Sequence, residues 1–382
     1  MSLIYKKLLK SKIYKLMSDS GKKMPKPPYE NRIEGWWFKD EEIRSANKVG
    51  KMLTLDLDIG KACDLHCSFC FASTHSKDNK DYINKNTIRI KQILKEAAEL
   101  GCKSIKIVGA GEPLLFPNLI EILEYCKKLK IIPIIFTGGH VFGDDNRAKN
   151  VFKKYGINSA KELVDKLYRL DCCFIVKFMS LNPKLHAKLV GANFDYIKYR
   201  DQGLLNLIER GFNYTKPTRL GVDCLLLKDN YREAVSLFSF FNQFNIFCVL
   251  NTSMDCGKTE YKLANPQVIS KDKALKVSID LYRYCLKNKI PFDKRISPYF
   301  CSPVCSQLNH GLFIGDDNIV KACPGGPDIA QYSKGKLKEI WKNNPFRKKY
   351  NEILGHECIS RVGRTYHEDF EYRVRKAIKF IK

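Results

Sequence analysis

The chain has 382 residues, of which 44% are hydrophobic, so it can bury the core of one large domain and a smaller one. Its formal net charge of +26 favours an anionic substrate, a nucleic acid or a membrane surface as partner. No apolar run approaches the ~20 residues of a membrane span, and no signal peptide is recognisable, so we expect a cytoplasmic protein. In that reducing compartment, metal ligation explains the clustered spacing of seven of the fifteen cysteines better than disulfides do, and we expect most of the other eight to be ordinary buried thiols.

The first twenty residues place apolar side chains at helical spacing between five lysines, which predicts a basic amphipathic helix. Such a helix can lie on a membrane, bind a nucleic acid or cap the protein's own core, and we favour the last. Residues 24–28, Lys-Pro-Lys-Pro-Pro, are typical of a linker, and Trp36-Trp37 is the expected anchor that fixes this extension to the main domain. Residues 1–49 therefore form the expected N-terminal region.

An alternating apolar run over residues 53–59 predicts a strand, and three cysteines follow it with the spacing C-x3-C-x2-C: Cys63, Cys67 and Cys70. A loop that leaves the end of a strand is where α/β barrels keep their active sites. Thiolates are soft ligands for zinc or iron–sulfur clusters, but a zinc ribbon pairs two C-x2-C motifs. Three cysteines on a four-iron cluster leave one iron open to a small molecule. The alternative is three free buried cysteines that lie close by chance.

Strands and helices alternate from this loop to residue 251. The further strands are expected at residues 104–108, 131–136, 172–179, 220–227 and 246–251. The helices are expected at residues 88–100, 119–129, 160–170, 196–209 and 231–241. With the first strand this makes six strands in the pattern of parallel β/α winding.

A glycine-rich turn, Gly109-Ala-Gly-Glu-Pro113, ends the second strand, where glycines let the backbone approach a ligand closely. This turn and the cysteine spacing, with Phe69 before the last cysteine, resemble the signature of the radical S-adenosylmethionine (SAM) superfamily. The resemblance implies an α/β fold, a partial (β/α)6 barrel over residues 50–290. It also implies a 4Fe-4S cluster on the three cysteines, with SAM on the open iron.

In the family the corresponding turn binds the methionine amino group of SAM, which implies contacts from Gly109, Gly111 and Glu112. Ala110 stands where the family has its second glycine. After the fourth strand, Ser180 and Asn182 resemble a segment whose polar groups approach SAM, with helix capping as the alternative. Thr137-Gly138-Gly139 likewise resembles a family turn.

A hydrogen-atom donor is implied if the reaction is an epimerisation. Cys256, just after the sixth strand, is the candidate for that catalytic role, with Cys172 or Cys173 as alternatives.

The last region, residues 291–382, carries a second group of cysteines. Two short strands around Asp316-Asp317-Asn318 predict a hairpin, and residues 337–350 predict a helix. The cysteines around these elements are Cys301, Cys305, Cys323 and Cys358. This arrangement resembles the C-terminal SPASM or twitch extension of radical SAM proteins, which implies an auxiliary 4Fe-4S cluster on the four thiols. Four cysteines fit the single-cluster twitch form better, and a structural zinc on the same thiols is the alternative.

The resemblance implies an enzyme that reductively cleaves SAM to a 5′-deoxyadenosyl radical and takes hydrogen from an anionic small-molecule or peptide substrate. The outcome would be oxidation, epimerisation or cross-linking, with an external electron donor such as flavodoxin or ferredoxin. One alternative is radical SAM modification of RNA or lipid. Another is a non-catalytic metal protein that binds nucleic acid, although the sequence has no aromatic-interleaved basic sheet motif and no zinc-finger spacing.

Overall fold

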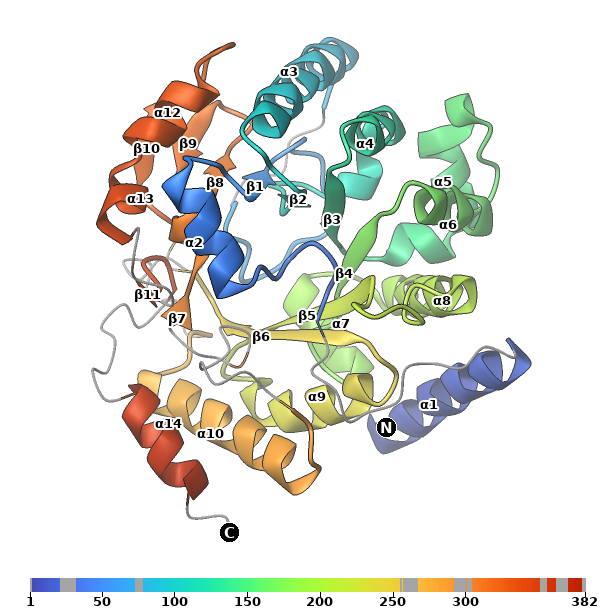
Figure 1. The fold of residues 1–382 in the computed structure, drawn as a ribbon. Coiled ribbons are helices and arrows are strands. Elements are labelled where there is room, and N and C mark those ends of the chain that lie inside the picture. Colours follow the sequence, from blue (N-terminus) through green and yellow to red (C-terminus); the bar gives the residue numbers. More distant parts are fainter. Residues whose placement is uncertain are drawn as a thin grey trace.

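A curved β-sheet forms the centre of the molecule (Figure 1). The computed structural model describes residues 2–20, 32–72, 78–254, 256, 267–291, 300, 304–350, 356–361 and 370–379. Within these residues one nine-stranded sheet has the order β10-β9-β8-β1-β2-β3-β4-β5-β6. Its parallel barrel strands are β1 (Thr54–Leu57), β2 (Ser104–Ile107), β3 (Ile132–Thr137), β4 (Cys173–Lys177), β5 (Leu220–Leu226) and β6 (Phe247–Thr252). The predicted partial barrel of six parallel strands is confirmed.

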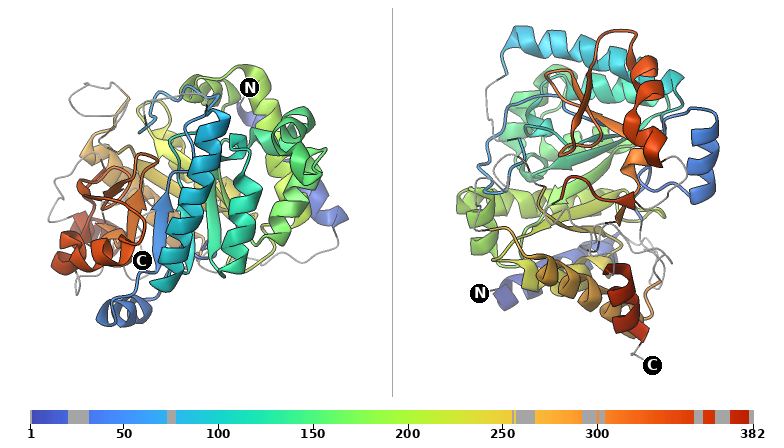
Figure 2. Two further views of the ribbon diagram at one scale, coloured as in Figure 1. Left: turned by 90° about the horizontal axis from the view of Figure 1, so that it is seen from above. Right: turned by 90° about the vertical axis from the view of Figure 1, so that its left-hand side faces the viewer.

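Helices cover the outside of this sheet (Figure 2), because parallel strands are joined by crossovers that place helices on the sheet face. They are α3 (Lys80–Glu99), α4 (Leu119–Lys128), α5 (Asp145–Phe152), α6 (Ala160–Arg169), α7 (Pro183–Val190), α8 (Phe194–Arg210), α9 (Ala234–Asn242) and α10 (Lys271–Lys287). The residues of β1 and β2 are buried throughout, as expected for strands covered on both faces. The main core lies between sheet and helices.

Local capping explains where several helices begin. Helix α3 starts at Lys80 rather than near residue 88, because the Asn79 side chain accepts a hydrogen bond from Tyr82 N. Helix α7, which was not predicted, is capped by Asn182 and has Pro183 in its first turn. It ends at Gly191, whose φ of +62° suits glycine.

The N-terminal region packs on the barrel through α1 (Ser2–Asp19), the predicted basic helix. Leu9 and Ile13 are buried, and the Tyr5 hydroxyl donates to the Asp201 carboxylate of α8 at 2.9 Å. The prediction that this helix caps the protein's own core is confirmed. Helix α2 (Asp40–Lys48) follows and was not predicted.

The predicted tryptophan anchor is also present. Ile33 pairs with Thr218 just before β5, so the segment crosses the amino-terminal end of the barrel. The Trp36 ring packs edge-on against Phe136 of β3 with centroids 5.4 Å apart. Both Trp36 and Trp37 also line a cavity in the barrel, which is part of the candidate active site, so the anchor reaches the inside of the barrel.

The C-terminal hairpin continues the barrel sheet. Its strands are β8 (Gly311–Ile314) and β9 (Ile319–Lys321), which pair antiparallel as predicted, and β10 (Asp328–Gln331) adds to β9. Strand β8 also pairs in parallel with β1, so the sheet runs across the expected boundary between residues 290 and 291. The division into residues 1–49, 50–290 and 291–382 stays a prediction.

The single helix expected over residues 337–350 is wrong. The structure has α12 (Leu337–Asn343) and α13 (Pro345–Tyr350), because proline cannot continue a helix and disfavours helical geometry in the residue before it. The remaining elements are β7 (Val304–Cys305), α11 (Gln307–His310), β11 (His356–Glu357) and α14 (Phe370–Lys379). Within the described residues, we find no helix with the length and hydropathy of a membrane span.

Candidate active site

The cysteine loop is fixed to its surroundings by main-chain hydrogen bonds. His66 N and Ser68 N donate to the carbonyl oxygens of Val190 and Leu189 at the end of α7, each at 3.0 Å. A Cβ atom on Gly191 would lie 2.4 Å from the His66 carbonyl oxygen, so the helix end must be glycine for the loop to lie this close. The unpredicted helix α7 thus positions Cys67 and its neighbours.

The glycine-rich turn after β2 lies against the start of the same loop. Glu112 N donates to Ala62 O at 2.8 Å, and a Cβ atom on Gly111 would lie 2.5 Å from that oxygen. Gly109 has a φ of +46°, a conformation that favours glycine. The structure therefore brings Gly109, Gly111 and Glu112 together with the loop that carries Cys63.

The buried carboxylate of Glu112 joins the ends of β2 and β3. It accepts hydrogen bonds from Leu114 N at 3.0 Å and from Thr137 Oγ1 and Gly138 N at 2.6 Å each. Both carboxylate oxygens are thus engaged by the protein itself. Glu112 therefore shapes the turn, and we expect the backbone of the turn, rather than this carboxylate, to be available to a ligand.

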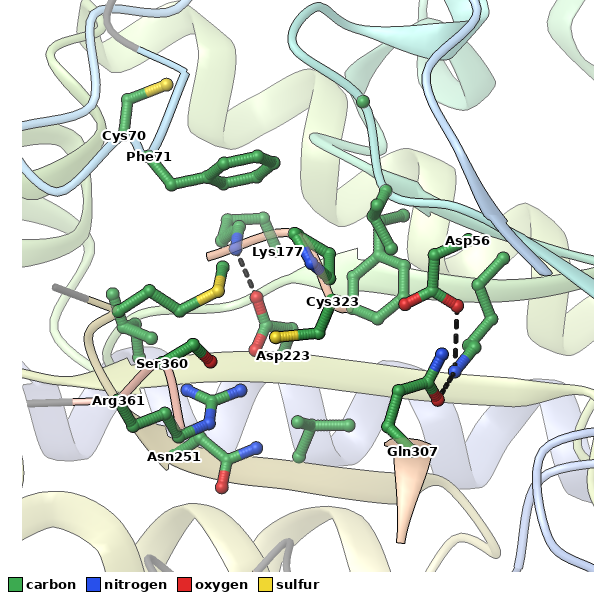
Figure 3. Close-up of a pocket in the computed structure, with 18 of the residues that line it drawn as sticks. Asp56, Cys70, Phe71, Lys177, Asp223, Asn251, Gln307, Cys323, Ser360 and Arg361 are labelled. Carbon is green, nitrogen blue, oxygen red and sulfur yellow. Dashed lines mark hydrogen bonds and ion pairs between the residues drawn. The ribbon is translucent and has the colours of Figure 1, made fainter. Parts of the chain in front are cut away.

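One cavity of about 310 Å³ lies at the carboxyl ends of the barrel strands (Figure 3). Its lining includes cysteines from both groups: Cys63, Cys67, Cys70, Cys305, Cys323 and Cys358. Pairing of β7 with β11 places Cys305 opposite His356, close to Cys358. Cys301, the fourth expected auxiliary ligand, lies outside the described residues. The two cysteine groups, which are far apart in the sequence, thus share one cavity.

Thiols are the donors that hold iron–sulfur clusters in proteins. Burial raises the pKa of Cys63 to about 12, that of Cys305 to about 11 and that of Cys323 to about 12, so a bound metal has to displace their protons. No three cysteine, histidine or acidic side chains of the described residues stand close enough together for a single metal ion. A four-iron cluster binds each thiolate at a different iron. The three-thiol loop beside a glycine cradle fits such a group.

Two buried ion pairs project from the strands into the cavity (Figure 3). Lys106 Nζ of β2 lies 2.9 Å from Asp56 Oδ1 of β1 and donates to Gln307 Oε1 at 2.7 Å. Lys177 of β4 pairs with Asp223 of β5. Because each lysine lies against a carboxylate, these charges largely neutralise each other.

These pairs were not predicted from the sequence, although a signal was present. Each charge interrupts an apolar strand, as in Leu55-Asp56-Leu57 and Ile105-Lys106-Ile107. A charge in a fully buried strand needs a partner or a function.

A cluster of three polar side chains, His140, Asp64 and Arg147, also holds the cysteine loop in place. His140 Nε2 lies 3.0 Å from Asp64 Oδ2, and Arg147 of α5 bonds the same oxygen. His140 belongs to the short helix η2 (His140–Gly143), directly after the predicted Thr137-Gly138-Gly139 turn. Burial lowers the pKa of His140, which favours the neutral imidazole.

Other predicted site residues lie away from the cavity lining. The Ser180 hydroxyl donates to Glu233, and the Asn182 side chain accepts from Lys184 N as the cap of α7. Neither belongs to the residues that line the cavity. The capping alternative therefore accounts for Asn182, and their contact with SAM stays a prediction.

The candidate hydrogen donors are also outside the lining residues. Cys256 is half-buried, and its hydrogen-donor role stays a prediction. Cys172 and Cys173 are fully buried at the start of β4, the opposite end of the strand from the cysteine loop. Neither side chain lines the cavity, and their role as hydrogen donors stays a prediction.

The described structure is thus an α/β protein with a partial parallel barrel and three cysteines on the loop after the first barrel strand. Residues 57–229 match the model of the Radical SAM superfamily, and this part of the chain is a radical SAM domain. The resemblance seen in the sequence is thereby confirmed.

Curated relatives resemble part of the chain, and three of them show the range. The probable GTP 3′,8-cyclase of Methanocaldococcus jannaschii is 27% identical over 196 residues, 51% of this chain and 57% of that protein. The probable GTP 3′,8-cyclase of Methanococcus maripaludis (strain C5) is 31% identical over 170 residues, 44% of this chain and 49% of that protein. An S-adenosylmethionine-dependent nucleotide dehydratase of Lacinutrix mariniflava is 26% identical over 113 residues, 29% of this chain and 23% of that protein. The chain spans about half the length of the two cyclases.

Solved structures share the fold over most of the chain, among them the following two. SuiB of Streptococcus suis, bound to its precursor peptide SuiA, has a TM-score of 0.52 at 16% identity, covering 82% of this chain and 70% of that one. Native anSMEcpe with bound AdoMet has a TM-score of 0.52 at 13% identity, covering 85% and 96%. At these identities the likeness shows the fold alone. The radical SAM fold implies a 4Fe-4S cluster and SAM as cofactors.

Proposed function

We propose that this protein is a radical SAM enzyme that acts on an anionic small molecule or a peptide. When bound, the cluster and SAM supply one electron and a 5′-deoxyadenosyl radical that takes hydrogen from the substrate. Oxidation, epimerisation and cross-linking are the outcomes that such chemistry allows. The observation that carries this proposal is the single cavity shared by the cysteine loop and the C-terminal cysteines.

Cys63, Cys67 and Cys70 would hold the SAM-binding cluster, since three thiols leave one iron open. The backbone of Gly109 and Gly111, which already lies against the cysteine loop, would face the methionine end of SAM. Glu112 would support that contact indirectly, because its carboxylate braces the turn from the side of β3.

Cys305, Cys323 and Cys358 would hold the auxiliary 4Fe-4S cluster, with Cys301 as the fourth ligand. Their position in the same cavity supports a role near the substrate rather than a remote structural one. Zinc is the other metal that thiolates favour, but no three described side chains stand close enough together for a single ion, and zinc would not exchange electrons. Metal analysis of the purified protein separates the two.

A nucleotide is the first substrate to test, because the curated relatives are named for GTP and nucleotide chemistry. A peptide is the second substrate to test, because the fold is shared with SuiB, which was solved bound to its precursor peptide. The paired lysines argue against a strongly basic cavity, so a nucleotide would have to displace or share these pairs. An external electron donor such as flavodoxin or ferredoxin and a cytoplasmic setting complete the proposal.

The test is anaerobic reconstitution with iron and sulfide, followed by SAM and a reductant. We expect 5′-deoxyadenosine and an iron content above about four per chain, the latter because the second site also loads. Changing the three loop cysteines to Ala should abolish 5′-deoxyadenosine formation. Cys126→Ala is the matched control, since this thiol is buried in the core away from the cavity.

The competing function, a zinc protein that binds nucleic acid, predicts a different set of results. It requires zinc instead of iron after anaerobic purification and steeply salt-dependent binding of DNA or RNA. Formation of 5′-deoxyadenosine by the parent protein but not by the loop-cysteine variant would exclude it. Deuterium transfer from labelled GTP or a labelled peptide into 5′-deoxyadenosine would then identify the substrate class.

A further inference from the structure

Helix α1 exposes large apolar side chains to solvent. The described residues include nine exposed large hydrophobic side chains, and four of them lie on this one helix: Leu3, Ile4, Leu8 and Tyr14. Leu3 is 64% exposed, Ile4 73% and Leu8 55%. Single exposed apolar residues need no explanation, but a cluster on one element marks an interaction surface.

The rotation of α1 about its own axis is fixed, so this exposure is a property of the fold. Leu9 and Ile13 on the inner face are buried against the barrel helices. The Tyr5 hydroxyl bonds the Asp201 carboxylate and also accepts from Arg200 Nη2 at 3.0 Å. Helix α1 therefore has two apolar faces, and the described part of the protein covers only the inner one. Figure 1 shows the helix at the periphery of the molecule, beside α8 and α9.

Lysines surround the exposed apolar side chains. Lys7, Lys12 and Lys15 are exposed, and Ile4, Leu8, Ser11 and Lys15 follow each other at spacings of three or four residues, on one face. None of the helix's five lysines forms an ion pair with a described acidic side chain, whereas many lysines of the barrel do. Asp19 is the one acidic residue among the first twenty.

We propose that the outer face of α1, defined by Ile4, Lys7, Leu8, Ser11 and Lys15, binds an anionic lipid surface. Ile4 and Leu8 would enter the boundary between headgroups and acyl chains, and the lysines would contact lipid phosphates. This geometry places the helix flat on the membrane, with the barrel on the water side.

The chemistry of this face favours a lipid surface over a nucleic acid or a second copy of the protein. Aliphatic side chains gain nothing from a phosphate backbone, so a nucleic acid would leave Ile4 and Leu8 without a role. A second copy would bring two sets of lysines together in a symmetric contact, and like charges there are unfavourable. An anionic bilayer satisfies both the aliphatic and the basic side chains.

Vesicle co-sedimentation of the full-length protein tests the proposal. We expect binding to vesicles of phosphatidylcholine with phosphatidylglycerol, and at least about tenfold weaker binding to pure phosphatidylcholine. Ile4→Glu with Leu8→Glu should abolish binding, and Lys7→Glu with Lys15→Glu should weaken it at least about tenfold. The matched control is Val49→Glu with Ile88→Glu, two similarly exposed apolar residues outside α1, which should bind like the parent.

Circular dichroism and the 5′-deoxyadenosine assay show whether each variant remains folded, because none of the changed residues belongs to the candidate active site. Failure of the parent protein to bind anionic vesicles would overturn the proposal. So would equal loss of binding in the Val49→Glu/Ile88→Glu control. Binding of RNA or DNA without vesicle binding, or a concentration-dependent dimer that Ile4→Glu/Leu8→Glu abolishes, would assign the face to one of the rejected occupants.

Discussion

His140 Nε2 and Asp64 Oδ2 are 3.0 Å apart, and Asp64 directly follows the first cysteine of the loop. His140 is buried, and the centroid of its ring lies 5.2 Å from that of the Tyr196 ring of α8. The loop is thus held from the end of β3 as well as from α7. Because the His140 ring is buried and packs against Tyr196, it fixes the orientation of Asp64 and, through Asp64, that of the neighbouring Cys63.

Removing this contact should loosen the cysteine loop, the proposed cluster-binding segment, without unfolding the barrel. We expect His140→Ala to lower iron retention and SAM cleavage by about 10–100-fold, as is typical when a residue that orients a metal ligand is lost. His140→Gln, which keeps a donor near the position of Nε2, should recover most of the loss. The readouts are iron content, the EPR spectrum of the reduced cluster and 5′-deoxyadenosine formation. Equal behaviour of the Ala and Gln variants would show that the hydrogen bond does not position the loop.

Gly111 cannot carry a side chain in this structure. The Cβ atom of Gly111→Ala would lie 2.5 Å from Ala62 O and 2.8 Å from Lys61 C, and main-chain atoms cannot yield as a side-chain tip can. We expect the cysteine loop to shift and SAM cleavage to fall by about 100-fold, since misplacement of about 1 Å can have that effect.

Gly156→Ala is the control for that substitution. Gly156 has a φ of +75°, and an added Cβ atom would meet no other atom within 4 Å, so the change strains only the backbone, at about 1 kcal/mol. Thermal unfolding should shift slightly, and SAM cleavage should stay at the parent level. If both glycine variants lose activity equally, general destabilisation and not the contact with Ala62 is responsible.

Lys106 and Asp56 form a buried ion pair, so the effects of substituting them on the free energy of unfolding should be strongly coupled. Both side chains are only 6% exposed, so Lys106→Met leaves the Asp56 carboxylate without its cation. We expect a loss of about 3 kcal/mol in the free energy of unfolding at pH 8. Adding Asp56→Asn should recover most of it, because a neutral amide has no charge to desolvate. Denaturant titrations of the four proteins in this double-mutant cycle measure the coupling, and additive effects would contradict it.

The features that the sequence predicted are local ones. The spacing of Cys63, Cys67 and Cys70 and the turn from Gly109 to Pro113 are contiguous, and both resemble family motifs. Six apolar runs separated by helical periodicity predicted parallel β/α winding, and the family resemblance implied that the six units form a partial barrel. The hairpin followed from two short strands around an Asp-Asp-Asn turn.

The missed features depend on contacts between distant parts of the chain. Parallel pairing of β8 with β1 joins Gly311 to Thr54, and no turn residue signals such a contact. The same holds for Gln307 beside Lys106. For Asn182, by contrast, the neighbouring residues did carry a signal. Asn182 resembles a family segment that contacts SAM, but an Asn directly before a proline is also typical of a helix N-cap. The structure contains this N-cap.

Asp58, just beyond β1, predicts an unusual pH dependence of stability. This residue is 4% exposed, and its Oδ1 atom has no hydrogen-bond partner in the described structure. Burial and the neighbouring Asp316 raise its pKa to about 8, while the Ala110 amide and Arg89 act in the opposite direction. Asp317 from the same hairpin turn adds a smaller raising effect.

The sign of the effect follows from this raised pKa. In the unfolded chain Asp58 ionises near its usual pKa of about 4, whereas in the folded protein it holds its proton until about pH 8. The folded state therefore loses stability as the pH rises from about 4 to about 8. We expect Asp58→Asn to lie within about 1 kcal/mol of the parent at about pH 4.5 and to be more stable by on the order of 5 kcal/mol at about pH 8.5.

Urea unfolding midpoints between about pH 4.5 and 8.5 measure this difference. Asp81→Asn is the matched control, because the Asp81 side chain is 74% exposed on α3 and its ion pair with Lys85 lies in solvent. Its curve should run parallel to that of the parent over the whole range. A parallel curve for Asp58→Asn as well would mean that Asp58 is ionised in the folded protein near neutral pH, with Arg89 outweighing burial and Asp316.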